Sequence, residues 1–459
     1  MSLFSLQFII FITIIFLLYY LGPINLRKIV LLLTGYLFCF SFGWKCIIAL
    51  ILATVITYLF ARILEKHKSA LLLITCIVLC ITLLFFTRIS DILPAIGISF
   101  YTLQAIGYVV DVYNRKTTVC NNILDYALYV SFFPTLLSGP IERSTSLLPQ
   151  IRQSAKEFNL EMVKSGMWCM LGGYCLKLLI ADRLSLIVDA AFGAVGDTSG
   201  GTLAIAVILY GLQLYADFAG YSLLVYGIAR VFGYEIILNF KQPYFSQSIR
   251  EFWGRWHISL SNFLKDYIYI PLGGSRCSKA RIFINLLITF TVSGIWHGMG
   301  LNFMVWGLIH GIYQILGRFF SHSKSNPKSD KGILVKVMKA LRTFVLVDFA
   351  WIFFRATSLN EAFAVVKKIF TEFDVLGTFD NCDFLMGYSK LRFILLILEI
   401  AIWVIIDIMH EKNISIISIL DNQKSIVRYL VYSGIVVVLL IAVIHDLGMG
   451  NSGFIYANF

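Results

Sequence analysis

Long apolar stretches, separated by short polar segments, recur along the whole chain. They fall near residues 3–21, 29–44, 46–61, 70–86, 92–110, 123–139, 163–181, 202–232, 282–297, 301–317, 343–357, 391–409 and 427–445. A membrane-crossing helix needs about 20 apolar residues, so the pattern predicts about ten to twelve crossings, with the shorter runs tilted, re-entrant or broken. The expected fold class is therefore an all-α polytopic membrane protein.

Composition supports the same class. Of the 459 residues, 59% are hydrophobic and 14% are charged, and the mean hydropathy is +0.82. Soluble domains carry about one quarter charged residues, so this is an integral membrane protein, expected as one domain over residues 1–459. The run 3–21 has no basic segment before it and no small-residue cleavage site, which indicates a retained helix rather than a cleaved signal. We expect a multi-pass protein of the cytoplasmic membrane.

The formal net charge of +12 comes from basic residues grouped between the apolar runs, at 62–68, 241–281 and 318–342. Such an excess is typical of cytoplasmic loops, so it favours membrane lipid over nucleic acid as the partner. Arg27 and Lys28 follow the first apolar run and place the N-terminus outside. The nine cysteines show no Cys-x-x-Cys spacing, which argues against a metal site and against a disulfide framework.

Residues 246–270 differ from the membrane runs. Large apolar residues recur there at intervals of three and four, which predicts one amphipathic helix at the cytoplasmic boundary. His257 is four residues from Trp253 and three from Leu260, so it shares their apolar face and points into protein.

Residues 282–317 contain no Asp, Glu, Lys or Arg, and they break at a glycine-containing segment, 298–302. This pattern predicts a helical hairpin, with His297 ending the first arm and His310 in the second. A histidine inside a membrane usually has a function or a partner. Two interpretations are open for His257, His297 and His310. Each can take part in chemistry, as a general base or a hydrogen-bond donor, or each can be a structural group that is hydrogen-bonded to a neighbouring helix.

Asp217 is the only charge between Gly200 and Arg230. It is either a functional carboxylate or a helix-to-helix anchor. The chain has no P-loop, no Gly-x-Ser-x-Gly elbow, no HExxH and no dinucleotide fingerprint, which argues against an ATPase, a serine hydrolase and a zinc enzyme.

Several ordered motifs resemble the membrane-bound O-acyltransferase (MBOAT) family, in its bacterial branch typified by the alginate O-acetyltransferase membrane subunit. Residues 252–274 match FWRRWHISLS…DYLYIPLGG with slight departures, for example Gly254 in place of Arg. Further matches are Gly-Ile-Ser-Phe-Tyr at 97–101, Ser-Gly-Pro-Ile-Glu-Arg at 138–143, Trp-His-Gly at 296–298 and Trp-Ile-Phe-Phe-Arg-Ala at 351–356. The chain departs from the family at Leu223, where a second acid is missing, and in the tail 454–459.

The resemblance implies a ring of about ten to twelve tilted helices around a central tunnel. It implies acyl transfer from cytoplasmic acyl-CoA, acetyl-CoA in particular, to a hydroxyl acceptor outside, for O-acetylation of an exported polysaccharide or envelope glycan. His297 matches the family's catalytic histidine and His257 its second motif histidine. No bound cofactor and no metal are expected, and an exported SGNH-type acyltransferase or acceptor protein is the expected partner.

Two other functions stay open. One is D-alanyl transfer toward teichoic acid, and the other is a non-enzymatic transporter with a histidine-lined path. Four basic residues either attract the phosphates of CoA or only follow the positive-inside rule; they are Arg250, Arg255, Lys265 and Arg276. The acceptor can be an exopolysaccharide, peptidoglycan, a lipid-linked glycan or a protein serine.

Overall fold

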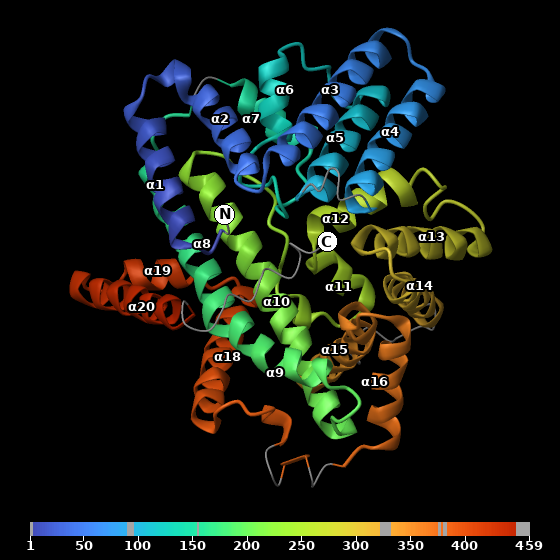
Figure 1. Ribbon diagram of the computed structural model, residues 1–459, viewed down its shortest axis with the longest axis vertical. Helices are drawn as coiled ribbons and strands as arrows, with labels where there is room; N and C mark the ends of the chain where they lie inside the picture. The colour runs from blue at the N-terminus through green and yellow to red at the C-terminus, as the bar shows by residue number, and fades with distance from the viewer. Residues whose placement is uncertain are drawn as a thin grey trace.

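The computed structural model describes residues 3–89, 96–153, 156–321, 332–374, 378–379 and 383–446, and all regular structure in these ranges is helical (Figure 1). Its α-helices are α1 (Leu6–Leu21), α2 (Arg27–Phe40), α3 (Trp44–Lys66), α4 (Ala70–Ile89), α5 (Ile98–Tyr113), α6 (Ile123–Val130), α7 (Ser144–Arg152), α8 (Leu160–Cys175), α9 (Asp182–Gly193), α10 (Gly200–Val231), α11 (Ile249–Arg255), α12 (Ile258–Leu264), α13 (Lys279–His297), α14 (Leu301–Ser321), α15 (Ile333–Arg355), α16 (Leu359–Thr371), α18 (Lys390–Glu411), α19 (Ile416–Asp421) and α20 (Ser425–Asp446). Short 3-10 turns lie at Ile24–Leu26, Pro243–Phe245 and Asp383–Leu385, and π-helical turns at Leu176–Ala181 and Lys265–Tyr269.

Five of the described helices are long and apolar enough to cross a membrane, namely α3, α4, α10, α13 and α20. They confirm the predicted all-helical, multi-pass membrane class. The ring of about ten to twelve crossings and its tunnel stay predictions. The divergent tail 454–459 lies outside the described residues.

Helix α10 forms the centre of the molecule and runs beside α8 (Figure 1). Two pairs of glycines allow these helices to meet: a Cβ on Gly173 would lie 2.6 Å from the carbonyl oxygen of Gly220, and one on Gly166 would lie 2.6 Å from that of Gly227. Small residues at a helix interface let backbones approach closely, which replaces the hydrophobic driving force that lipid cannot supply. The close approach brings polar groups of α8 and its π-helical extension against α10.

The apolar run 123–139 is shorter than a membrane-crossing helix, and it is broken, which is one of the outcomes predicted for the shorter runs. Helix α6 ends at Val130, and residues 131–143 follow a buried irregular path. Pro134 and Pro140 explain the break, because proline cannot donate a helical hydrogen bond and disfavours helix in the preceding residue. Side chains supply hydrogen bonds to backbone groups that have no helical partner there. For example, Ser259 Oγ accepts a hydrogen bond from Ile141 N at 3.0 Å.

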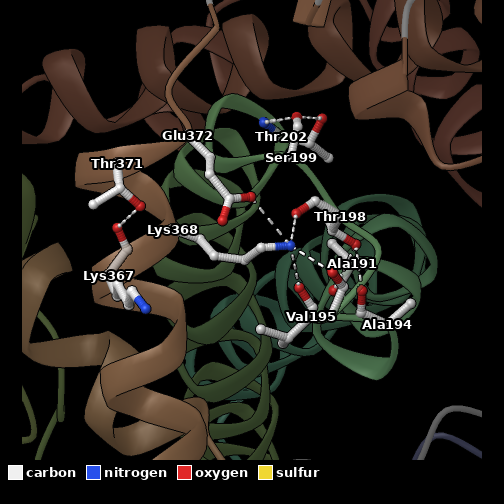
Figure 2. A network of polar contacts seen from close by, with 11 residues as sticks. Ala191, Ala194, Val195, Thr198, Ser199, Thr202, Lys367, Lys368, Thr371 and Glu372 are labelled. Atoms are coloured by element: carbon white, nitrogen blue, oxygen red, sulfur yellow. Dashed lines mark hydrogen bonds and ion pairs between the residues drawn. The ribbon is translucent and has the colours of Figure 1, made fainter.

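Lys368 of α16 fastens that helix to the turn between α9 and α10 (Figure 2). Its Nζ donates to the carbonyl oxygens of Val195, Gly196 and Thr198 at 3.1, 2.6 and 2.9 Å, and lies 3.4 Å from Glu372 Oε2. Carbonyl groups just beyond a helix lack intrahelical donors, so the ammonium both satisfies them and complements the negative end of α9.

Replacing Lys368 by Met is expected to lower the free energy of unfolding by about 1 to 3 kcal/mol, because three carbonyl acceptors lose a charged donor. Thermal unfolding in detergent measures the effect. Lys367→Met is the matched control, since the Lys367 side chain is exposed on the same helix. Equal melting temperatures for the two variants would show that the Lys368 contacts contribute nothing to stability.

Candidate active site

His297 is the last residue of α13, directly before the turn that leads to α14. The hairpin and its break at residues 298–300 are as predicted from sequence. The two arms touch through glycines: a Cβ on Gly294 would clash with the carbonyl oxygen of Phe303, and one on Gly307 with that of Phe290. His297 is buried, with 2% of its surface exposed.

His257 is buried, as predicted, but the single helix expected over 246–270 is wrong. The chain forms α11, then α12, and then a π-helical turn. His257 interrupts the helix because its backbone is left-handed, with φ of 43°. The next two amides bond to Asn239 instead of to the preceding turn: Ile258 N donates to its carbonyl oxygen at 3.0 Å and Ser259 N to its Oδ1 at 3.1 Å.

The two motif histidines meet at Trp296. The centroid of its ring lies 4.8 Å from that of His297 and 6.3 Å from that of His257. Phe218 of α10 also contacts His257, at 4.7 Å between centroids. Trp306 and Phe354 contact His297, at 5.1 and 5.3 Å. Five separate segments, namely α10, the junction of α11 and α12, α13, α14 and α15, thus place two imidazoles in one buried aromatic cluster.

His310 joins the same cluster from α14. Its Nδ1 accepts a hydrogen bond from Trp253 Nε1 at 3.3 Å. The ring of Trp306 lies between the two histidines of the hairpin, 5.1 Å from His297 and 5.1 Å from His310. The sequence left the role of His310 open, and the structure assigns it a hydrogen-bonded place behind Trp306.

Asp217 pairs with Lys177, whose Nζ lies 2.8 Å from Asp217 Oδ1 and 2.6 Å from Asp182 Oδ1. All three side chains are buried or nearly so. Of the two interpretations of Asp217, this geometry favours the helix-to-helix anchor. Lys177 was not among the candidate residues predicted from the sequence, although a lysine in an apolar run indicates a partner for an intramembrane acid such as Asp217. Because Phe218 follows Asp217 and touches His257, the anchor also supports the cluster.

The Ser-Gly-Pro-Ile-Glu-Arg segment supports the element that carries His257. Arg143 Nη2 lies 2.9 Å from Asp266 Oδ2, and its guanidinium lies 4.6 Å from the centroid of the Tyr267 ring. Glu142 Oε1 accepts from Ile237 N at 2.6 Å. The Arg143 contacts fix the irregular loop against the π-helical turn that follows α12, and the Glu142 contact fixes it against the segment between α10 and α11.

Of the four basic residues considered for CoA phosphates, Arg255 is already occupied. It pairs with Glu411 through two hydrogen bonds of 2.6 and 3.0 Å and lies 2.7 Å from Glu251. The hydrogen bond to Glu411 is the main reason that the pKa of Arg255 is raised. Arg250, Lys265 and Arg276 are exposed. Among the described residues, no group of three or more His, Cys, Asp or Glu is arranged to hold a metal ion.

A family model described as MBOAT, membrane-bound O-acyltransferase family, matches residues 119–353, which is more than half of the chain. The chain belongs to the membrane-bound O-acyltransferase family. The matched residues of this MBOAT member include His257, His297 and His310.

Two relatives of the MBOAT chain carry acetylation names. It is 36% identical over 283 residues to the probable alginate O-acetylase AlgI of Pseudomonas aeruginosa, covering 62% of this chain and 53% of the relative. It is 35% identical over 307 residues to the peptidoglycan O-acetyltransferase of Helicobacter pylori, covering 61% and 58%. A teichoic acid D-alanyltransferase of Streptococcus thermophilus is more distant, 25% identical over 256 residues, covering 53% and 61%. The chain thus spans a little over half of the length of the curated relatives it matches.

Proposed function

We propose that this MBOAT member moves an acyl group, specifically acetyl, from cytoplasmic acyl-CoA to a hydroxyl acceptor on the outer side of the membrane. The observation that carries the proposal is the buried pair His257 and His297, whose rings share Trp296 at the end of a membrane helix. Family membership and the names of the two acetylating relatives support the acyl chemistry.

In the proposed mechanism, His297 is the general base. It takes the proton of the acceptor hydroxyl while the oxygen attacks the thioester carbonyl and a carbon–oxygen bond forms. An N–H of His257 stabilises the oxyanion of the tetrahedral intermediate. The carbon–sulfur bond then breaks, and the proton held by His297 passes to the leaving sulfur, which departs as free CoA thiol. The histidines end the cycle in their starting protonation state.

The distribution of charge supports the proposed direction of transfer. The basic groups at 241–281 and 318–342 favour a cytoplasmic position for the side nearest α11, where Arg250, Lys265 and Arg276 would be available for the phosphates of CoA. Segments assigned to the outer side, such as 182–200 and 358–390, are short, and we therefore assign recognition of a long glycan to an exported SGNH-type partner or acceptor protein.

Release of free thiol from acetyl-CoA tests this proposal. Purified protein in liposomes is expected to release thiol slowly by itself, and faster when a candidate exported partner is added. A parallel arm offers a D-alanyl-loaded carrier protein, and preference for that donor would favour the D-alanyl alternative. A transporter consumes no thioester, so absence of thiol release with every donor and partner would overturn the enzymatic proposal. Efficient acetylation of free glycan by the purified chain alone would replace the two-component scheme by a single-protein transferase.

A further inference from the structure

Arg88, in the last turn of α4, is bound to the residue that precedes His297. Its Nη2 donates to the carbonyl oxygen of Trp296 at 2.8 Å and to Ser99 Oγ at 2.8 Å. Arg88 and Trp296 are 208 positions apart in sequence, so the contact joins two distant helices. A charged side chain inside the protein part of a membrane is costly unless it is paired, so an arginine at the end of an apolar helix that points toward the interior is expected to have a partner there.

The acceptors of Arg88 belong to a closed circuit of three helices. Trp296 of α13 donates its Nε1 hydrogen to the carbonyl oxygen of Ser99 in α5, at 3.3 Å. Phe100, the next residue of α5, packs on the Trp296 ring at 5.2 Å between centroids. Arg88 therefore hydrogen-bonds to both residues of the Ser99–Trp296 contact: to the side chain of Ser99 and to the backbone of Trp296.

The contact also suits the end of a helix. The last carbonyl groups of α13 have no intrahelical donor, and a positive charge is favoured there by the helix dipole. A guanidinium is always charged and presents its donors in a rigid plane, so it orients the peptide that it binds. That peptide joins Trp296 to His297.

We propose that Arg88 is a positioning residue for acyl transfer. By fixing Trp296, Arg88 sets the orientation of the His297 imidazole. It also sets the separation between His297 and His257, because the His257 ring packs against the same Trp296 indole. The proposal rests on the proposed function, with His297 as base. Arg88 lies outside the residues that match the family model and outside the motifs that resemble the family, so family membership alone does not select it; Ser99 lies in the motif at 97–101.

The test compares Arg88→Met, Arg88→Lys and Ser99→Ala in thiol release from acetyl-CoA, with kcat and KM measured separately. Misplacing a catalytic group by about 1 Å costs on the order of 100-fold in rate. We expect Arg88→Met to lower kcat by roughly 10- to 100-fold with KM changed by less than about threefold, because donor binding is untouched. Arg88→Lys is expected to recover part of the rate, and Ser99→Ala to lose less than Arg88→Met.

Arg62→Met is the matched control, since Arg62 lies on α3 and its guanidinium donates a hydrogen bond to the side chain of Asn121. An unchanged kcat in Arg88→Met, or a raised KM with unchanged kcat, would overturn the proposal. If Arg88→Met does not fold, the other two variants decide. A wild-type kcat in both Arg88→Lys and Ser99→Ala overturns the proposal, whereas a lowered kcat at unchanged KM in Ser99→Ala supports the proposal. Failure of the wild-type protein to release thiol would refute the proposed function instead.

Discussion

Replacing His297 by Gln should lower acyl transfer by on the order of 100-fold or more while the protein still folds, because a general base contributes at least that much to the rate. Glutamine fills a similar volume in the aromatic cluster and keeps polar atoms, but it cannot accept and return a proton. Thiol release from acetyl-CoA, measured in membranes that contain equal amounts of each variant, gives the ratio.

His67→Gln is the control, because His67 is exposed at the end of α3. Wild-type transfer by a folded His297→Gln variant would exclude the base mechanism. The double variant His257→Gln, His297→Gln adds a further criterion. If both histidines serve one step, it should lose little more than the poorer single variant, since residues that act as a unit are not additive.

The second large effect is expected at Lys177. Changing Lys177 to Met leaves the buried carboxylates of Asp217 and Asp182 without their cation, and breaking a buried pair in this way costs about 3 to 5 kcal/mol. We therefore expect much less folded protein, as measured by size-exclusion chromatography and thermal unfolding in detergent.

The matched control is Lys164→Met on α8, the helix that the π-helical turn carrying Lys177 continues. Lys164 pairs with Glu161 in an exposed position, with 59% and 82% of the side chains accessible, so its removal should change stability by less than about 1 kcal/mol. Combining Lys177→Met with Asp182→Asn and Asp217→Asn should recover part of the loss, since no uncompensated charge remains. Equal stability of Lys177→Met and Lys164→Met would contradict this account of the buried triad.

The sequence pattern predicted the features that depend on local composition. The charge-free stretch with its glycines predicted the α13–α14 hairpin and the place of His297 at its turn. The pattern could not predict the break at His257, because α11 and α12 keep the same apolar period on both sides. The break depends on Asn239, which accepts hydrogen bonds from the amides of Ile258 and Ser259, 19 and 20 residues further along the chain.

Contacts between helices that are far apart in the sequence were also not predicted. Lys177 and Asp217 are visible as isolated charges in apolar runs, and the rule that intramembrane charges pair would have joined them. Arg88 gave no such signal, because a basic residue at the end of an apolar run is also typical of a membrane boundary. Its contact with Trp296 depends on how α4, α5 and α13 pack, which one sequence does not encode in any short pattern.

The glycine contacts of the hairpin indicate which parts can move during the reaction and which cannot. With Gly294 against Phe303 and Gly307 against Phe290, neither arm can rotate about the other without separating their backbones. In the proposed mechanism, His297 is thus a stationary base, and the thioester and the hydroxyl would travel to it from opposite sides of the membrane. The rate at which substrates enter and products leave, rather than a swing of the catalytic helix, would then set the pace of turnover.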